Sequence, residues 1–289
     1  MSSSPQTSGT AQPAATPIAV TIAGSDSGGG AGIQADLKTF SALGVYGATV
    51  LTALTAQNTL GVQAIHDIPV TFIREQMASV FGDLKVTAVK IGMLSQARII
   101  ETVAGGLDQA GVAAIVLDPV MVATSGDRLL SVDAVDALRD ILMPRALVVT
   151  PNMHEAAVLT GLPLAESEAD MRRQGEMLLE RGARAVLVKG GHGDGRESVD
   201  VLVEPEGMTR FPGPRVATRN THGTGCTLSA AIAAGLATGL PLQPAVKQAK
   251  DYLGKALAAA DRLSIGSGSG PVHHFHRWWQ DDRKIIKSY

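Results

Sequence analysis

Cysteine is nearly absent from this chain: Cys226 is the only one among 289 residues, so no internal disulfide can form. Such cysteine usage is typical of a reducing compartment, and we expect a cytoplasmic location. Blocks of like charge are also absent, and the formal net charge is −2. The sequence therefore does not support nucleic acid or a charged membrane surface as a partner.

Long apolar segments are missing as well. The best candidate, residues 226–240, is too short to cross a bilayer and is interrupted by glycine. Residues 1–17 are rich in Ser, Thr, Pro, Ala and Gln, and they lack the basic start and apolar run of a signal peptide. We interpret them as a disordered N-terminal tail. We find no internal repeat.

What the chain does contain is short apolar strands that alternate with helical patterns. We predict strands at 18–23, 46–54, 86–92, 113–117, 146–149 and 185–188, followed by a hairpin or a pair of edge strands at 200–203 and 208–211. Helices are predicted at 31–43, 72–81, 96–110, 132–141 (capped by Ser131), 170–181, from 226 onward, and 242–263. This alternation indicates an α/β fold with a parallel sheet covered on both faces. Ligands then bind at the carboxyl ends of the strands.

Two glycines precede the apolar helix that begins near Cys226, in the sequence Gly223, Thr224, Gly225. Glycine lets the backbone approach a ligand closely, and the first amides of a helix have no partner inside it. The turn is therefore either a phosphate site or simply a tight entry into a well-packed helix. Cys226 lies where a helix terminus would stabilise a thiolate.

A second glycine-rich loop, residues 24–32, follows the first predicted strand. It does not match a dinucleotide-binding fingerprint, and it fails as a P-loop because Leu37 stands where the second glycine must be. What remains is a strand, a glycine loop and a helix that admit a small ligand. Asp36 lies one turn into that helix.

Polar side chains follow several other strands. Asn152 and Glu155 share one helix face, and Glu155 is either a magnesium ligand or a carboxylate favoured by the helix dipole. Asp118 is a second possible magnesium partner, or simply a polar strand end. Lys189 either reaches a phosphate or is solvated.

Histidines raise two further hypotheses. His222 lies four residues before Cys226, which is compatible with a Cys–His nucleophile in a hydrolase or acyltransferase, although no orienting Asn or Asp is identifiable. The C-terminal histidines are either metal ligands or part of a packed tail; we favour a tail packed by Phe275, Trp278 and Trp279, because no second ligand cluster is present. The histidines concerned are His273, His274 and His276.

Seven segments, taken in order, resemble the hydroxymethylpyrimidine/phosphomethylpyrimidine kinases of the ribokinase-like superfamily. They are residues 24–36, 56–59, 90–93, 150–152, 189–192, 221–229 and 270–276, and the likeness extends over almost everything from about residue 18 onward. One departure is the sequence Ser-Asp-Ser-Gly at 25–28, which differs from the forms typical of the family.

The resemblance implies a ribokinase-like α/β fold, as one domain over 18–289, with a mainly parallel central sheet and helices on both faces. It implies phosphorylation of 4-amino-5-hydroxymethyl-2-methylpyrimidine and then of its monophosphate, with ATP and Mg²⁺, in thiamine biosynthesis. It also implies a homodimer. The nearest rival is a pyridoxal kinase of the same fold, and a catalytically silent binding protein is a third possibility.

The resemblance further implies roles for individual residues. Cys226 stands where many sugar kinases of the superfamily carry an aspartate base, so it either takes the hydroxyl proton or only shapes the pocket. The remaining roles are catalytic for Gly223, Thr224, Gly225 and Lys189; substrate-binding for Gly24, Asp36, Gln57, Met93 and Val120; nucleotide-binding for Thr150, Asn152, Lys189 and Thr224; and metal-binding for Asp118 and Glu155.

Overall fold

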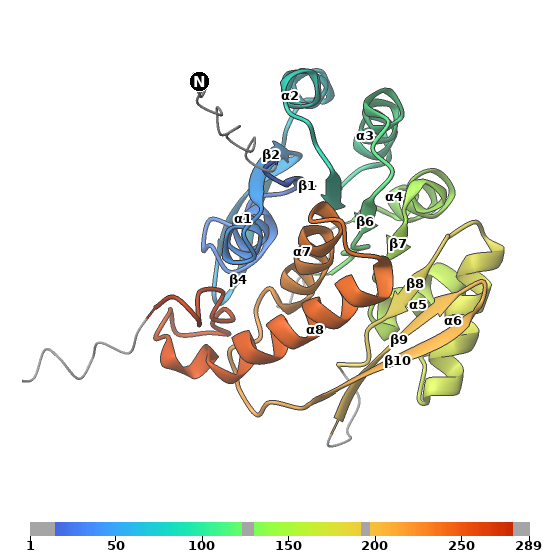
Figure 1. Cartoon of the computed structure of the whole chain (residues 1–289). Coiled ribbons are helices and arrows are strands. Elements are labelled where there is room, and N and C mark those ends of the chain that lie inside the picture. The colour runs from blue at the N-terminus through green and yellow to red at the C-terminus, as the bar shows by residue number, and fades with distance from the viewer. Residues whose placement is uncertain (1–14, 123–129, 192–196, 280–289) are drawn as a thin grey trace, which may run out of the picture.

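A computed structural model of the chain describes residues 15–122, 130–191 and 197–279. Most of the predicted tail, residues 1–14, and His192 lie outside this range. At the centre is an eight-stranded sheet in the order β10-β9-β8-β7-β6-β5-β1-β2 (Figure 1). Its strands are β1 (Ile18–Ala23), β2 (Tyr46–Leu51), β5 (Ala88–Ile91), β6 (Ile115–Leu117), β7 (Val148–Val149), β8 (Val186–Val188), β9 (Glu197–Glu204) and β10 (Gly207–Pro214).

The sheet is parallel from β2 to β8, and the predicted hairpin β9–β10 continues it in antiparallel pairing. Successive side chains of a strand point to opposite faces. Accordingly, Ile115 and Leu117 of β6 belong to one buried apolar cluster, and Val116 belongs to the other. Both faces are therefore buried, which explains why the strands are almost wholly apolar.

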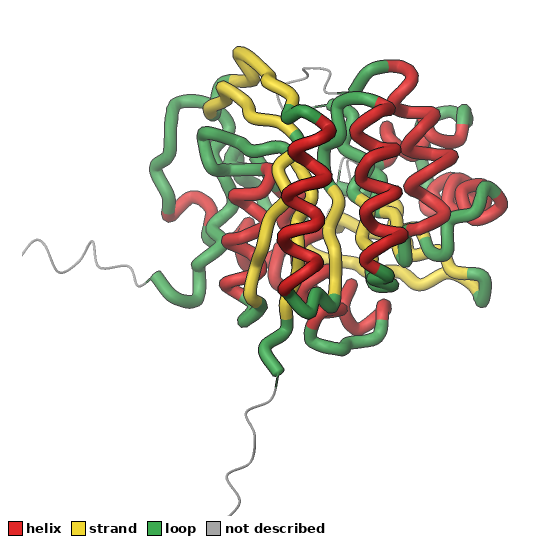
Figure 2. Tube along the Cα trace, turned by 90° about the horizontal axis from the view of Figure 1, so that it is seen from above, coloured by secondary structure: helices red, strands yellow, loops and turns green. Residues whose placement is uncertain are grey.

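Helices cover the two faces in separate layers (Figures 1 and 2). One face carries α1 (Gly32–Ala42), α7 (Thr224–Ala237) and α8 (Leu242–Ala258). The other carries α2 (Val70–Asp83), α3 (Ala97–Ala110), α4 (Val132–Ala137), α5 (Met153–Thr160) and α6 (Glu168–Glu180). This arrangement confirms the predicted α/β fold with a mainly parallel sheet.

One predicted strand was too long. The segment 46–54 divides at Thr52, and β3 (Ala53–Asn58) pairs with β4 (Gly61–Asp67) in a separate two-stranded sheet. Thr52 bonds in three directions: its amide donates to Ala23, its carbonyl accepts from Ile68, and its hydroxyl donates to the Met93 carbonyl at 3.0 Å. These contacts, which local pattern does not reveal, end β2.

Helix ends also differ from prediction. The Ser131 side chain does not cap α4, because its hydroxyl donates to the Ser95 carbonyl instead. The chain continues past α4 as a π-helical turn, Leu138–Leu142, and a 3₁₀ turn, Met143–Arg145. The last helix ends at Ala258 rather than near residue 263, and a 3₁₀ turn follows.

The C-terminal tail packs through Phe275 and Trp279. The Phe275 ring packs against the apolar cluster beneath α8 and stacks on Trp279 with the ring centroids 5.8 Å apart, and Trp279 also meets the His273 ring edge-on at 5.3 Å. His273 and His274 are buried, and Trp278 is 66% exposed, so the prediction is confirmed for Phe275 and Trp279 and wrong for Trp278. His274 is held by polar partners: its Nε2 lies 3.0 Å from the Thr227 hydroxyl, and its carbonyl accepts from the Tyr252 hydroxyl.

The described ranges contain neither a cluster of metal-binding side chains nor a membrane-spanning helix. No group of three or more His, Cys, Asp or Glu residues there is arranged to hold a metal ion. No helix within the same ranges has the length and apolarity needed to span a membrane.

Candidate active site

The glycine turn before α7 packs directly against the glycine loop of residues 24–32. Gly223 is the N-cap of α7 and has a φ of 78°, a conformation that favours glycine. A Cβ atom on Gly223 would overlap the Gly30 carbonyl oxygen, and one on Gly30 would overlap the His222 ring. Only glycine at both positions allows the two loops to meet.

The first amides of α7 are free to bind an anion. Within the described part of the chain, the amides of Gly225 and Cys226 donate to no protein acceptor, and Thr224 has only a 3.3 Å bond to the Thr221 carbonyl. Unpaired amides at the positive end of a helix dipole attract negative charge. The geometry therefore favours a phosphate site over a plain turn.

A lysine lies beside these amides. The ammonium of Lys189 lies 3.4 Å from where a Cβ on Gly225 would be, so its charge is adjacent to the turn. It binds Asp118 Oδ1 at 2.8 Å and lies 3.9 Å from Glu155 Oε2. Burial opposes its charge, but the two carboxylates raise the pKa of Lys189. Lys189 is therefore a fixed charge and not a solvated side chain.

Asp118 is fully buried at the end of β6. Burial alone would raise its pKa, yet the ammonium groups of Lys189 and Lys90 hold the pKa of Asp118 below its usual range. Its oxygens also accept from the hydroxyls of Ser229 at 3.1 Å and Thr150 at 3.2 Å. Thr150 thus supports Asp118, and Ser229 is a contributor that the sequence did not single out.

Asn152 and Glu155 form a capping box at the start of α5. The Asn152 side chain accepts from the Glu155 amide at 2.9 Å, and Glu155 Oε2 accepts from the Asn152 amide at 2.7 Å. This reciprocal cap explains the Asn-x-x-Glu spacing locally. Burial raises the pKa of Glu155 to about 7, with Lys189 opposing the rise and Asp118 adding to it.

The predicted pyrimidine walls lie near the same loops. A Cβ on Gly24 would lie 2.6 Å from Met93 Cε, so these residues are in contact. Met93 and Val120 both pack on the apolar cluster at the carboxyl ends of the strands. The Gln57 amide nitrogen lies 3.4 Å from His222 Nε2 and therefore reaches the glycine turn before α7.

Asp36 is fully buried beneath the glycine loop. Its Oδ2 accepts from the Thr21 hydroxyl at 2.6 Å and from the Lys90 ammonium at 2.8 Å. Its Oδ1 has no hydrogen-bond partner among the described residues. One carboxylate oxygen is thus engaged by protein, and the other is a buried acceptor without a partner in the described structure.

Asp26, which the sequence did not single out, organises the glycine loop. Its carboxylate accepts from the amides of Gly28, Gly30 and Ala31 at 2.8 to 3.0 Å. Its Oδ2 also lies 2.9 Å from His222 Nε2, and these bonds hold its pKa low despite burial. An Asp two residues before a glycine is a turn signature, so this role was readable from Asp26 and Gly28.

Of the two roles expected for Cys226, the structure favours shaping the pocket over acting as a thiolate. Burial raises the pKa of Cys226 to about 11; Lys90 opposes this rise, and Asp36 and Asp118 add to it. The Gly32 amide, which donates to the sulfur, lowers the pKa by less than burial raises it. With a protonated thiol, and His222 Nε2 bound to Asp26, the Cys–His nucleophile hypothesis loses its support.

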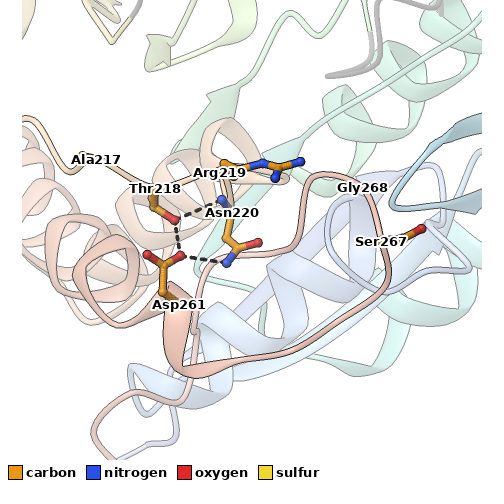
Figure 3. A pocket seen from close by; sticks show the side chains of 7 residues that line it. All are labelled: Ala217, Thr218, Arg219, Asn220, Asp261, Ser267 and Gly268. Carbon is orange, nitrogen blue, oxygen red and sulfur yellow. Dashed lines mark hydrogen bonds between the residues drawn. The ribbon is translucent and has the colours of Figure 1, made fainter.

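Two surface hollows lie near the site. The larger, about 620 Å³, contains none of the predicted site residues; Figure 3 shows Thr218 and Asn220 both donating to Asp261 there. These hydrogen bonds hold the segment that leads into the glycine turn before α7 against Asp261. The smaller, about 260 Å³, is lined by residues that include Gln57 and His222.

Comparisons with known proteins agree with this geometry. Residues 26–273 match the family model described as phosphomethylpyrimidine kinase. A hydroxymethylpyrimidine/phosphomethylpyrimidine kinase of Rhizobium meliloti is 62% identical over 266 residues, which cover 92% of this chain and all of the relative.

Two solved structures are similar as well. A phosphomethylpyrimidine kinase from Clostridium difficile is 44% identical with a TM-score of 0.74, and the match covers 83% of this chain and 99% of that one. A Bacillus subtilis pyridoxal kinase, solved as an ADP complex, is 36% identical with a TM-score of 0.83, over 91% and 99% of the two chains. The chain belongs to the phosphomethylpyrimidine kinase family.

Proposed function

We propose that this protein is an ATP-dependent kinase in thiamine biosynthesis. It phosphorylates 4-amino-5-hydroxymethyl-2-methylpyrimidine and then converts the monophosphate to the diphosphate. One observation carries this proposal: the amides of Gly225 and Cys226, which donate to no acceptor in the described structure, lie beside the fixed charge of Lys189. This anion site lies next to the loop of Gly24 and Met93, in a chain of this family.

The proposed reaction is an in-line phosphoryl transfer. An oxygen of the acceptor bonds to the γ-phosphorus of ATP while the bond to the β-phosphate oxygen breaks, and ADP leaves. The amides of Gly225 and Cys226 stabilise charge on the transferring group, together with Lys189. Because the transition state is loose, the hydroxyl proton need not leave early. A neutral Cys226 is compatible with this chemistry and shapes the pocket.

Magnesium is part of the proposal. Mg²⁺ prefers oxygen ligands and usually keeps several waters, so it needs only one or two carboxylates from the protein. Asp118 and Glu155 provide such carboxylates on either side of Lys189, and the donor set fits. When bound, the ion would neutralise phosphate charge. Asn152 holds Glu155 in place through the capping box.

Pyridoxal is the second candidate acceptor, because a pyridoxal kinase is 36% identical over 91% of this chain. We propose a mass-spectrometric product assay with magnesium, ATP and an equimolar mixture of the hydroxymethylpyrimidine and pyridoxal. The expected result is pyrimidine that carries one and then two phosphoryl groups. If pyridoxal alone is phosphorylated, the protein is a vitamin B6 kinase. If no phosphorylated product forms, a catalytically silent binding protein becomes the better interpretation.

We also propose a homodimer and a cytosolic location. The hairpin β3–β4 carries exposed apolar side chains, among them Leu54, Leu60 and Ile65. Ile65 pairs with Thr55, so Leu54 and Ile65 point to opposite faces of the hairpin. An exposed apolar face of this hairpin is the candidate contact for a second copy of the chain. The single cysteine supports the location.

A further inference from the structure

Lys90 is a fully buried lysine in the otherwise apolar strand β5. Its ammonium lies 2.8 Å from Asp36 Oδ2, and both side chains have no exposed surface. Burying two charges costs so much solvation that apolar residues of similar volume often stabilise a protein equally well. Stability alone therefore does not explain why the chain buries Lys90 and Asp36, and we look for a function of the pair.

The pair lies directly under the proposed pyrimidine site. Asp36 comes from the first turns of α1, immediately after the glycine loop, and Lys90 stands three residues before Met93. A Cβ on Gly92 would lie 2.8 Å from the Lys90 ammonium, so the backbone leading to Met93 packs on this charge. Displacing the ammonium would disturb both the carboxylate and the substrate wall.

The carboxylate is only half satisfied. Oδ2 accepts from Thr21 and Lys90, while buried Oδ1 has no partner in the described structure. An unsatisfied buried acceptor is costly and calls for an explanation. A bound aminopyrimidine presents N–H donors on its edge, which would supply the missing hydrogen bond.

The charge on Asp36 depends on its neighbours. Burial raises the pKa of Asp36; Lys90 opposes this rise, and Asp118 adds to it. In turn, Asp36, Cys226 and Asp118 all favour the charged form of Lys90. Without Lys90, the buried carboxyl would bind a proton, and its Oδ1 would compete with the amine as a donor.

Resting on the proposed function, we propose that Lys90 is a positioning residue that keeps Asp36 an ionised acceptor for an N–H group of the pyrimidine. Lys90 acts through Asp36 and does not contact the substrate. The completely buried ammonium of Lys90 thereby contributes to substrate specificity.

The first test is Lys90→Met, with exposed Lys85→Met as the matched control. At neutral pH we expect the KM for the pyrimidine to rise by roughly tenfold or more, while the KM for ATP changes by less than about threefold. The pyrimidine KM should recover as the pH is raised and Asp36 ionises. A KM equal to the wild-type value across the pH range would overturn the proposal.

A second variant guards against a folding defect. Asp36→Leu/Lys90→Met removes both charges, so we expect a Tm close to that of the wild type and a severely raised pyrimidine KM. A large drop in Tm, or an unchanged KM, would show that the pair is structural. If the wild type instead phosphorylates pyridoxal alone, the proposed function fails, whereas the same comparison with pyridoxal still tests Lys90.

Discussion

At the scale of single residues, burial decides the chemistry of this site more than residue type does. Burial raises the pKa of Cys226 to about 11 and the pKa of Glu155 to about 7. Asp118 is fully buried, yet the ammonium groups of Lys189 and Lys90 hold its pKa below the usual range. Three acidic groups thus differ in charge within one site, and each difference has a measurable consequence.

The first prediction concerns Cys226. Because burial raises its pKa to about 11, the thiol is protonated at neutral pH and cannot serve as a ready base. We expect Cys226→Ala and Cys226→Ser to lower kcat by less than about tenfold, since a general base typically contributes about a hundredfold or more. Steady-state rates over a pH series provide the measurement. A loss of about a hundredfold in both variants would instead identify a base.

The second prediction concerns Glu155. Its pKa is about 7 in the folded protein, against an ordinary value of 4.5 for a glutamate, so the folded state binds more protons between these values. The associated stability is present below the lower pKa and is lost as the pH rises through the upper one. Glu155→Gln should therefore stabilise the protein progressively, by roughly 2 kcal/mol more at about pH 8 than at about pH 5.

Denaturant unfolding of Glu155→Gln without nucleotide, at several pH values, measures this difference. Glutamine keeps an oxygen to accept from the Asn152 amide, so the capping box need not be lost. Exposed Glu180→Gln is the control. A Glu155→Gln effect that stays constant with pH would contradict the assignment.

At the scale of elements, the site depends on two glycine-rich loops that meet. The Asp26 carboxylate shapes one loop and binds His222 at the entry to the other. Helix α7 follows with small residues on every side, because it is buried between the sheet, α1 and α8. The amides of Gly225 and Cys226, which have no acceptor among the described residues, lie at the first turn of this buried helix.

The third prediction compares the two glycines that flank α7, which have similar φ angles. Gly223 has a φ of 78° and Gly239 a φ of 88°, but only Gly223 contacts the glycine loop. Gly239→Ala should lose about 1 kcal/mol of stability through backbone strain. Gly223→Ala should lose more, because its Cβ would also overlap the Gly30 carbonyl oxygen. Gly223→Ala should also lower kcat by about a hundredfold or more, because the phosphate-binding amides move.

Kinetics and thermal unfolding of the two variants measure the difference. Gly239→Ala is the control for strain alone, since nothing lies within 4 Å of its new Cβ. Similar activity in the two variants would mean that contact between the loops is not required.

At the scale of the whole molecule, the parallel sheet brings together residues that are distant in sequence. Lys189, Asp118 and the helix that carries Ser229 meet at the carboxyl ends of the central strands. The small sheet β3–β4 stands apart from the eight-stranded one and exposes apolar residues. It is the surface on which the dimer proposal is tested.

The fourth prediction concerns this hairpin. Leu54 on β3 and Leu164 between α5 and α6 are each 44% exposed, so they form a matched pair. We expect the wild type to be a dimer, Leu54→Lys to shift it toward monomer, and Leu164→Lys to leave it unchanged. Light scattering coupled to size-exclusion chromatography measures the mass. A monomeric wild type would overturn the dimer proposal.

The sequence alone predicted the parallel sheet and several features of the candidate site. Apolar strands alternating with helices predicted the parallel sheet, because both faces of such a sheet are buried. Glycines at 223 and 225 predicted an approachable backbone, and the Asn152–Glu155 spacing placed both residues on one helix face. These inferences succeed because they depend on periodicity and on residues near in sequence.

Only the tertiary structure decided the charges and the partners. The sequence places Cys226 at a helix terminus, which favours a thiolate, but burial near Asp36 and Asp118 reverses that preference. The pairing of Lys90 with Asp36 joins residues 54 positions apart, and no local pattern encodes it. Desolvation and Coulomb interactions depend on distance in space, and the folded chain alone sets those distances.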